Sequence, residues 1–256
     1  MSNFGDKDIF LEIPAGNITG QSSVHKFGRN EAVGTTQEDV WDGGGTYGFY
    51  PTAAVACDVD STSASDASMS VRIFGLDGTG ALQEEVVTLD AADPSATPVA
   101  TANSYWRIFR MINESSADNV GAITLRNNGA AGGLGDNTIG AQITIGFNQT
   151  LMAIYTIPVG KTGYMVNWDA STDRNAGATA AVDLELRVRP ASSVSARQVF
   201  QIKNHHGLVL AGTTFFDKVF TPYQKINALS DIVVRATASS STADVHADFD
   251  LILVDD

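Results

Sequence analysis

The most regular feature of this 256-residue chain is the alternation of apolar with polar positions. It is clearest in residues 182–188, where valine and leucine occupy every second position and charged residues lie between them. Residues 232–236 and 245–253 follow a similar pattern. Side chains of a β-strand point alternately to its two faces. A period of two therefore predicts strands with one buried and one wet face.

Shorter segments rich in β-branched and aromatic residues predict further strands. These segments are residues 9–13, 71–76, 85–89, 105–112, 122–126, 142–146, 152–157, 164–169, 198–203 and 218–221. Between them lie runs of Gly, Asn, Asp, Pro and Ser, the residues that turns use. No segment shows the period of an amphipathic helix, and residues 192–197 allow at most one short turn. We therefore expect an all-β fold of the β-sandwich or jelly-roll kind.

The distribution of strands predicts two such domains behind an N-terminal arm. Residues 149–256 start a fresh set of strands with its own apolar positions, and residues 56–148 suffice for a second, smaller sandwich. Residues 1–55 remain as a leading strand and an extended arm. A chain of this length can bury two cores of moderate size.

The segment from His25 to Ala54 has neither a helical nor a strand period. It carries five aromatic residues, Phe27, Trp41, Tyr47, Phe49 and Tyr50, which are too many for a segment that stays solvated. Three consecutive glycines at residues 43–45 permit positive φ and close backbone approach. This composition predicts an arm that orders by docking its rings on its own domain or on a neighbouring chain. These five residues are our candidate partner-binding site.

Charge limits the classes of partner. The chain has 16 Lys and Arg against 29 Asp and Glu, a formal net charge of −13. Phosphate contacts need clustered cations, so a nucleic-acid surface is not expected. No apolar run reaches membrane-spanning length, and the first residues lack the basic and apolar regions of a secretory signal. We expect a chain that folds in a cytoplasm and has no membrane partner.

Candidate catalytic and metal-binding groups occur only in patterns that favour structural roles. Cys57 is the single cysteine, which excludes an intramolecular disulfide, and we interpret it as a small buried hydrophobe. A phosphate loop and a serine nucleophile elbow are both absent. His205 and His206 are adjacent, so a strand would point them to opposite faces and they would chelate poorly. Metal, cofactor and enzymatic activity are therefore not expected.

Acidic clusters and tryptophans are interpreted in the same way. Asp58, Asp60 and Asp66 resemble a calcium loop but lack the glycine and glutamate of an EF-hand. Glycoside hydrolysis needs two carboxylates that face one sugar. The candidate pairs are Glu38 with Asp39, Glu84 with Glu85, and Asp169 with Asp173. In a chain with 29 acids such pairs arise by chance, so solvated surface is the preferred interpretation. Trp106 and Trp168 lie inside strand patterns, which favours packing over stacking on sugars.

Six segments together carry a resemblance to a known family. They are F-G-R-N-E-A-V (27–33), E-D-V-W-D-G-G-G-T-Y-G-F-Y-P-T-A-A (38–54), V-R-I-F-G-L-D (71–77), V-V-T-L-D (86–90), Y-W-R-I-F-R (105–110) and N-Q-T-L-M-A-I-Y-T-I-P-V-G-K-T-G-Y (148–164). They resemble tailed-phage virion structural proteins, which occur in phages of marine and freshwater bacteria, cyanophages included. The likeness extends over about residues 5–255, and its most specific part is the W-D-G-G-G segment.

The resemblance implies a non-enzymatic particle component that is present in many symmetric copies. Our leading expectation is a capsid decoration or cement protein, a homotrimer seated on the major capsid protein and held there by the aromatic arm. The alternative is a tail or fibre component whose C-terminal sandwich binds a host glycan. Both place the chain in the virion after assembly in the host cytoplasm.

Overall fold

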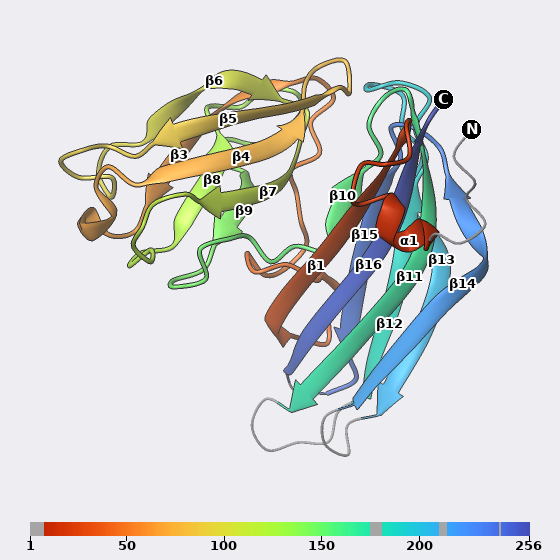
Figure 1. Cartoon of the computed structure of the whole chain (residues 1–256). Coiled ribbons are helices and arrows are strands. Elements are labelled where there is room, and N and C mark those ends of the chain that lie inside the picture. Colours follow the sequence, from red (N-terminus) through yellow and green to blue (C-terminus); the bar gives the residue numbers. More distant parts are fainter. Residues whose placement is uncertain (1–7, 175–180, 210–213, 241) are drawn as a thin grey trace.

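The computed structural model describes residues 8–174, 181–209, 214–240 and 242–256, and nearly all its regular structure is antiparallel β-sheet (Figure 1). The strands are β1 Gln21–Val33, β2 Glu38–Asp39, β3 Val55–Ser61, β4 Ser70–Leu76, β5 Leu82–Thr88, β6 Val99–Tyr105, β7 Arg107–Asn113, β8 Ile123–Asn127, β9 Ile139–Ile143, β10 Ile154–Thr156, β11 Lys161–Arg174, β12 Ala181–Arg189, β13 Gln201–Val209, β14 Thr214–Ile226, β15 Asp231–Ala238 and β16 Ala243–Asp255. The predicted all-β class is confirmed.

The strands form four sheets that pack in pairs. In the C-terminal sandwich, the sheet β1-β16-β11-β14 faces the sheet β10-β15-β12-β13, to which β2 adds beside β15. In the inserted sandwich, which lies between β2 and β10 in the sequence, β6-β3-β8-β9 faces β5-β4-β7. Figure 1 shows the two sandwiches side by side, with β13 and β14 at the border of the C-terminal sandwich that faces away from the inserted one.

Strand β1 joins the beginning of the chain to its end. It pairs with β16 from Gln21↔Val254 to Val33↔Ala243, and β2 pairs with β15. The predicted leading segment thus supplies two strands to the sheets formed by residues 149–256.

Much of β1 falls in the segment that showed no strand period, so that expectation was wrong. Three of the buried positions of β1 are Lys26, Gly28 and Asn30, which carry no apolar side chain; the fourth is Val33. The Lys26 ammonium donates a hydrogen bond to the Phe109 carbonyl oxygen, and Asn30 Nδ2 donates to the Asp39 carbonyl oxygen at 3.2 Å. A Cβ on Gly28 would lie 2.3 Å from the Val40 carbonyl oxygen. Polar partners and a close backbone approach replaced the apolar alternation that sequence analysis detects.

A second correction concerns residues 9–13, which form a helical turn, α1 (Ile9–Glu12), in place of a strand. The Asp8 side chain accepts a hydrogen bond from the Phe10 amide at 3.0 Å and so caps the turn. Ile9, Phe10 and Leu11 are all exposed, and Phe10 packs edge-on against Tyr223 of β14. Helix capping and contact with β14 outweighed the β-propensity of this short segment.

The two cores meet at the junction of the sandwiches. Trp106 of the inserted half packs in the core of the C-terminal sandwich, and Trp41, Met152 and Val233 pack in the core of the inserted sandwich. Trp106 and Trp168 are fully buried, which confirms their predicted packing role.

Candidate functional site

The five predicted aromatic anchors lie in and beside this junction. Trp41, Tyr47 and Phe49 are at most 3% exposed, whereas Tyr50 and Phe27 are half-buried. Trp41, Tyr47 and Tyr50 form a chain of edge-on contacts with centroids 5.1 Å apart at each step. A ring buried in its own chain has no surface left for another chain. The structure thus docks Trp41, Tyr47 and Phe49 within this chain, which corrects the expectation that they contact a partner.

The acids of the same segment fix the shape of the loop. Glu38 accepts hydrogen bonds from the Gly34 and Gly45 amides at 3.0 and 3.1 Å. The buried Asp39 carboxylate accepts from the Tyr47 amide and from Arg235 Nε, both at 2.7 Å. The predicted pair Glu38 and Asp39 therefore organises a loop and does not face a cleft.

The glycines of the loop allow it to fold over Trp41. Gly44 and Gly45 have φ of +69° and +63°, and a Cβ on Gly43 would lie 2.2 Å from the Trp41 ring. Any side chain at position 43 would displace the indole. The W-D-G-G-G segment is thus explained by packing within the chain.

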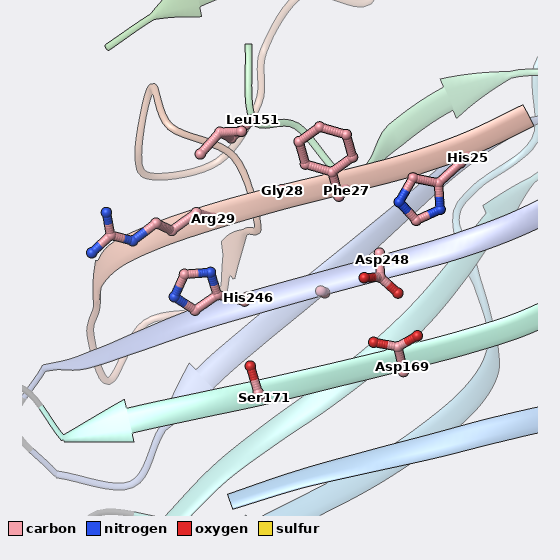
Figure 2. Close-up of a pocket in the computed structure, with 10 residues that line it drawn as sticks. His25, Phe27, Gly28, Arg29, Leu151, Asp169, Ser171, His246 and Asp248 are labelled. Atoms are coloured by element: carbon pink, nitrogen blue, oxygen red, sulfur yellow. The ribbon is translucent and has the colours of Figure 1, made fainter. Parts of the chain in front are cut away.

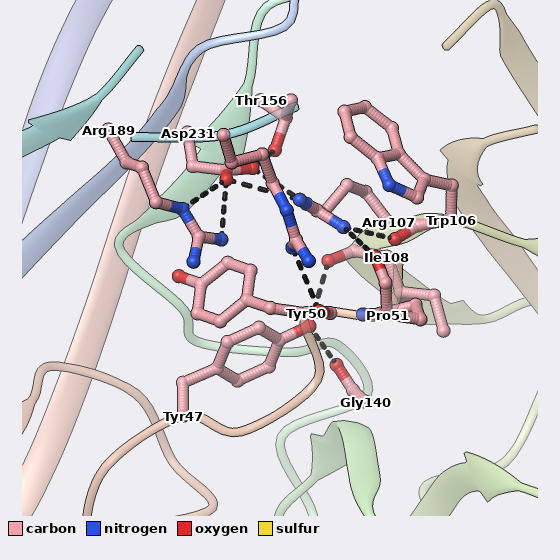
Figure 3. Close-up of polar contacts among 11 residues, drawn as sticks. Tyr47, Tyr50, Pro51, Trp106, Arg107, Ile108, Gly140, Thr156, Arg189 and Asp231 are labelled. Atoms are coloured by element: carbon pink, nitrogen blue, oxygen red, sulfur yellow. Dashed lines mark hydrogen bonds and ion pairs between the residues drawn. The ribbon is translucent and has the colours of Figure 1, made fainter. Parts of the chain in front are cut away.

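A buried ionic network crosses the junction next to these rings (Figure 3). Asp231 of β15, which has no exposed surface, accepts from Arg107 Nε of β7 at 2.6 Å and from Arg189 Nη2 of β12 at 2.6 Å. Thr156 Oγ1 donates to the same carboxylate at 2.7 Å. Burial by itself raises the pKa of Asp231, but the Arg107 guanidinium, helped by Arg189 and Thr156, outweighs burial and leaves this pKa below its ordinary value.

Tyr50 and Arg197 complete the network. The Tyr50 ring lies 4.1 Å from the Arg189 guanidinium carbon and 5.1 Å from that of Arg107. Arg197 Nη1 donates to the Tyr50 carbonyl oxygen at 2.8 Å. Burial, together with the nearby Arg107 and Arg189, lowers the pKa of Arg197 to about 10. This arrangement holds the two sandwiches together.

The remaining chemical candidates also have structural roles. Burial raises the pKa of the Cys57 thiol to about 12, so this cysteine is the buried hydrophobe that was predicted. Asp66 is buried and accepts from the Val120 and Gly121 amides at 2.7 and 2.9 Å. Glu85 accepts from the Tyr105 hydroxyl at 2.8 Å. Within the described residues no group of three or more His, Cys, Asp or Glu side chains is placed to hold a metal ion.

A hollow of about 410 Å³ lies on the outer face of the sheet β1-β16-β11-β14 (Figure 2). Its lining includes Phe27, one of the predicted anchors, and Leu151 of the segment that leads into β10. The polar side chains in it are His25, Arg29, Asp169, Ser171, His246 and Asp248, supplied by β1, β11 and β16.

Three aspartates form a row across this face. Asp169 of β11 is directly opposite Asp248 of β16 on one side and Asp217 of β14 on the other. Partial burial, followed by the closeness of Asp169, raises the pKa of Asp248 to about 8. Like charges on directly opposite strand positions repel each other, so Asp248 keeps its proton at neutral pH. The predicted partner of Asp169 was Asp173, whereas the register of the sheet supplies Asp248 and Asp217.

The strands β13 and β14 form a second unusual surface, which we call the β13–β14 edge. They are the outermost strands of their two sheets and most of their residues are exposed. The exposed apolar side chains on them are Ile202, Val209, Phe215, Val219 and Tyr223, and Phe215 is 75% exposed. The exposed lysines on them are Lys203, Lys218 and Lys225, and the exposed histidines are His205 and His206.

The two histidines diverge on β13, as predicted for adjacent strand residues. His206 packs its ring 4.2 Å from that of Phe216, and His205 lies 3.8 Å from the Asp183 carboxylate on the neighbouring strand β12. In the sequence, His205 and His206 were recognised only as a poor chelate, and most of this edge carried no pattern that marked it as a surface. The only available signal was the apolar content of residues 199–223, which also occurs in ordinary strands.

No protein-family model matches the chain, and no curated protein matches it. Solved structures with some likeness to the chain come from infectious bursal disease virus. The structure of its Gt strain is 11% identical with a TM-score of 0.25, covering 96% of this chain and 78% of that chain. The structure of its derived T=1 particles is 11% identical with a TM-score of 0.23, and the match covers 92% of this chain and 74% of that chain. The structure of its VP2 subviral particle is 9% identical with a TM-score of 0.25, and the match covers 96% of this chain and 77% of that chain. Such TM-scores are too low to indicate a shared fold or function.

No helix among the described residues has the length and apolar character needed to cross a membrane.

Proposed function

We propose that this chain is a structural component of a virion, and that it acts as a capsid decoration or cement protein. Its action is mechanical: many copies bridge neighbouring subunits of the major capsid protein and stabilise the head. A protein that binds only the assembled lattice stabilises it in proportion to occupancy and affinity. The role is non-enzymatic, and the virion that contains the chain is assembled in the host cytoplasm.

The observation that carries this proposal is the β13–β14 edge. Exposed apolar side chains scattered singly are normal, but contiguous ones mark interaction sites. Here two outermost strands carry five large exposed apolar side chains, and the exposed Phe10 of α1 packs against Tyr223. Uncovered strand edges of this kind pair or aggregate unless another surface covers them. A protein that works as one copy among many in an assembly has such a surface to cover.

The sequence resemblance to tailed-phage virion proteins supports the same class. Its most specific segment, W-D-G-G-G, builds the junction that fixes the two sandwiches to each other. The two-lobed shape seen in Figure 1 suits a protein that spans a distance between neighbours on a lattice.

The alternative, a tail or fibre component that binds a host glycan, is favoured by one observation. The hollow on the C-terminal sandwich combines an aromatic ring, Phe27, with carboxylate, imidazole and hydroxyl groups, a mixture that suits sugar hydroxyls and the apolar face of a sugar ring. Binding of labelled glycans to the full chain, lost in Phe27→Ala, would favour this alternative.

Copy number on the particle tests the proposal. Quantitative mass spectrometry of purified virions should find the chain in numbers on the order of hundreds per head, as a symmetric lattice requires. Phe215→Ser combined with Val219→Ser should lower occupancy, whereas Val86→Ser, at an exposed apolar position of β5, should not. Absence from the particle, or about a dozen copies at a vertex or tail tip, would reject the decoration role.

A further inference from the structure

Two surfaces of the C-terminal sandwich carry opposite charges that the chain itself leaves unbalanced. The outer face of the sheet β1-β16-β11-β14 carries the aspartate row described above. The β13–β14 edge carries three of the chain's six lysines but a single acid, Asp217. Among the described residues, Lys203, Lys218 and Lys225 form no ion pair. A chain with a net charge of −13 thus concentrates unpaired cations on one edge.

We propose that the β13–β14 edge of one copy docks on the outer face of the β1-β16-β11-β14 sheet of a second copy. Lys203 and Lys218 of the edge are directed to Asp169 and Asp248 of the face. The inference rests on the proposed function, because it supplies the contact through which many copies associate.

Charge decides both the occupant and the orientation. An ammonium beside Asp169 and Asp248 balances the negative charge of this pair, with which no cation among the described residues forms an ion pair. Arg29, the guanidinium that lines the hollow, is already paired with Asp244 and Glu31, each at 2.6 Å. A symmetric edge-to-edge contact would bring lysines together, and a face-to-face contact would bring aspartates together. Only a head-to-tail contact pairs opposite charges, and repeated head-to-tail contacts close into a ring when the rotation permits.

Apolar groups border the charges on both surfaces. Phe27 lines one end of the aspartate row, and Val219 and Phe215 flank Asp217 at the other end. On the edge, the β13 strand that carries Lys203 also carries Ile202, which is 52% exposed. A polar centre with apolar neighbours on each side matches the composition of specific protein interfaces, in which large apolar and aromatic side chains supply most of the binding energy.

The contact should depend on pH through the aspartate row. The charged and titratable groups that face Asp248 are Asp169 of β11, Asp217 of β14, His25 and Arg29 of β1, and His246 and Asp250 of its own strand. Partial burial and the neighbouring carboxylate hold a proton on Asp248 up to about pH 8. Loss of that proton adds a negative charge where the lysine docks. Association should therefore strengthen as pH rises from about 7 to about 9 and weaken with added salt.

Two variants and their mixture test the orientation. The edge variant is Lys203→Glu with Lys218→Glu, and the face variant is Asp169→Asn with Asp248→Asn, which keeps side-chain size and removes like charges. Analytical ultracentrifugation in the presence of a chelator, at up to about 100 µM chain, measures association without a bridging divalent cation. The controls are Lys161→Gln, at the first residue of β11 and paired with Asp255, and Asp118→Asn, at an exposed position between β7 and β8.

The native chain should form oligomers in this range, and each variant should associate at least roughly tenfold more weakly than the native chain. Mixing the two variants should restore a contact that stops at a 1:1 dimer, because the edge of the face variant and the face of the edge variant are both intact. The inference is overturned if the native chain stays monomeric, if either folded variant associates like the native chain, or if the mixture gives no dimer. Thermal melting followed by circular dichroism serves as the control that both variants fold.

These results are independent of copy number on the particle. Head-to-tail association of a chain that is absent from virions would reject the proposed function and keep the contact. A chain that is abundant on heads but monomeric in solution would support the proposed function and reject the contact between copies.

Discussion

Two buried or half-buried aspartates of the C-terminal sandwich, Asp231 and Asp248, have pKa values that are shifted in opposite directions. Asp231 is completely buried at the junction, yet its pKa is lowered because Arg107 and Arg189 surround it. Asp248 is only half-buried on the outer face of a sheet, yet its pKa rises to about 8 because partial burial is joined by the like charge of Asp169. At Asp231 the neighbouring cations outweigh burial, whereas at Asp248 burial and the neighbouring carboxylate act in the same direction, so the sign of the neighbouring charge distinguishes the two sites.

The difference separates structural from associative chemistry in this molecule. At the junction the ionic groups Asp231, Arg107 and Arg189 have their partners within the chain. On the outer face the carboxylates face one another and solvent, so an outside cation would lower their free energy. Among the described residues, the carboxylates of Asp169 and Asp248 lack such cationic partners. The outer face and the β13–β14 edge are therefore the surfaces on which we expect a partner to bind.

The largest expected effect comes from breaking the buried network. Asp231→Ala leaves Arg107 and Arg189 without their carboxylate in a site closed to water. Removal of one partner from a buried ion pair costs roughly 3–5 kcal/mol, so the free energy of unfolding in urea should fall by about that amount. Asp118→Asn, at an exposed position, is the matched control and should change stability little. A loss no larger than that of the control would show that the network does not hold the junction.

Truncation of Trp41 should come next in size. From the sequence this ring is one of the five candidate partner-binding residues. The structure places it in the core of the inserted sandwich at 3% exposure, bridged to Met152. Trp41→Ala should therefore destabilise the chain by about 3 kcal/mol or more, since large cavities in cores cost that much. Trp41→Phe should be milder, and a variant with native stability and weakened association would restore the earlier interpretation.

The sequence predicted the all-β class and many of the strands because apolar alternation records which faces are buried. It missed β1, whose buried positions include Lys26, Gly28 and Asn30, because polar partners on distant strands are invisible to a periodicity. It identified the aromatic segment but not the surface on which its rings pack, because composition indicates that rings become buried without indicating against which residues. The aspartate row depends on the register of β11, β14 and β16, which sequence spacing does not contain.

Removing the like charge on the outer face should have an effect of intermediate size and opposite sign. Because its folded pKa is raised, Asp248 contributes stability that is complete below the ordinary aspartate range and is lost as pH rises toward about 8. Asp42, whose pKa burial raises to about 7, acts in the same direction in native and variant chains. Asp248→Asn should gain about 1 kcal/mol on the native chain between about pH 5 and about pH 9, a figure reduced for solvent screening. Urea titrations across this range measure it, and parallel profiles would show that Asp248 ionises normally.

The smallest effect is expected for an ion pair at the protein surface, in contrast to the buried network at the junction. Lys161 and Asp255 form an ion pair with side chains 25% and 57% exposed. A double-mutant cycle with Lys161→Gln and Asp255→Asn should give a coupling of no more than about 1 kcal/mol, because exposed pairs gain little in water. Added salt should abolish this coupling, whereas the cost of Asp231→Ala should persist, since buried charges are screened much less. A surface coupling as large and as salt-resistant as the buried one would mean that enclosure by both sandwiches gives the junction network no special weight.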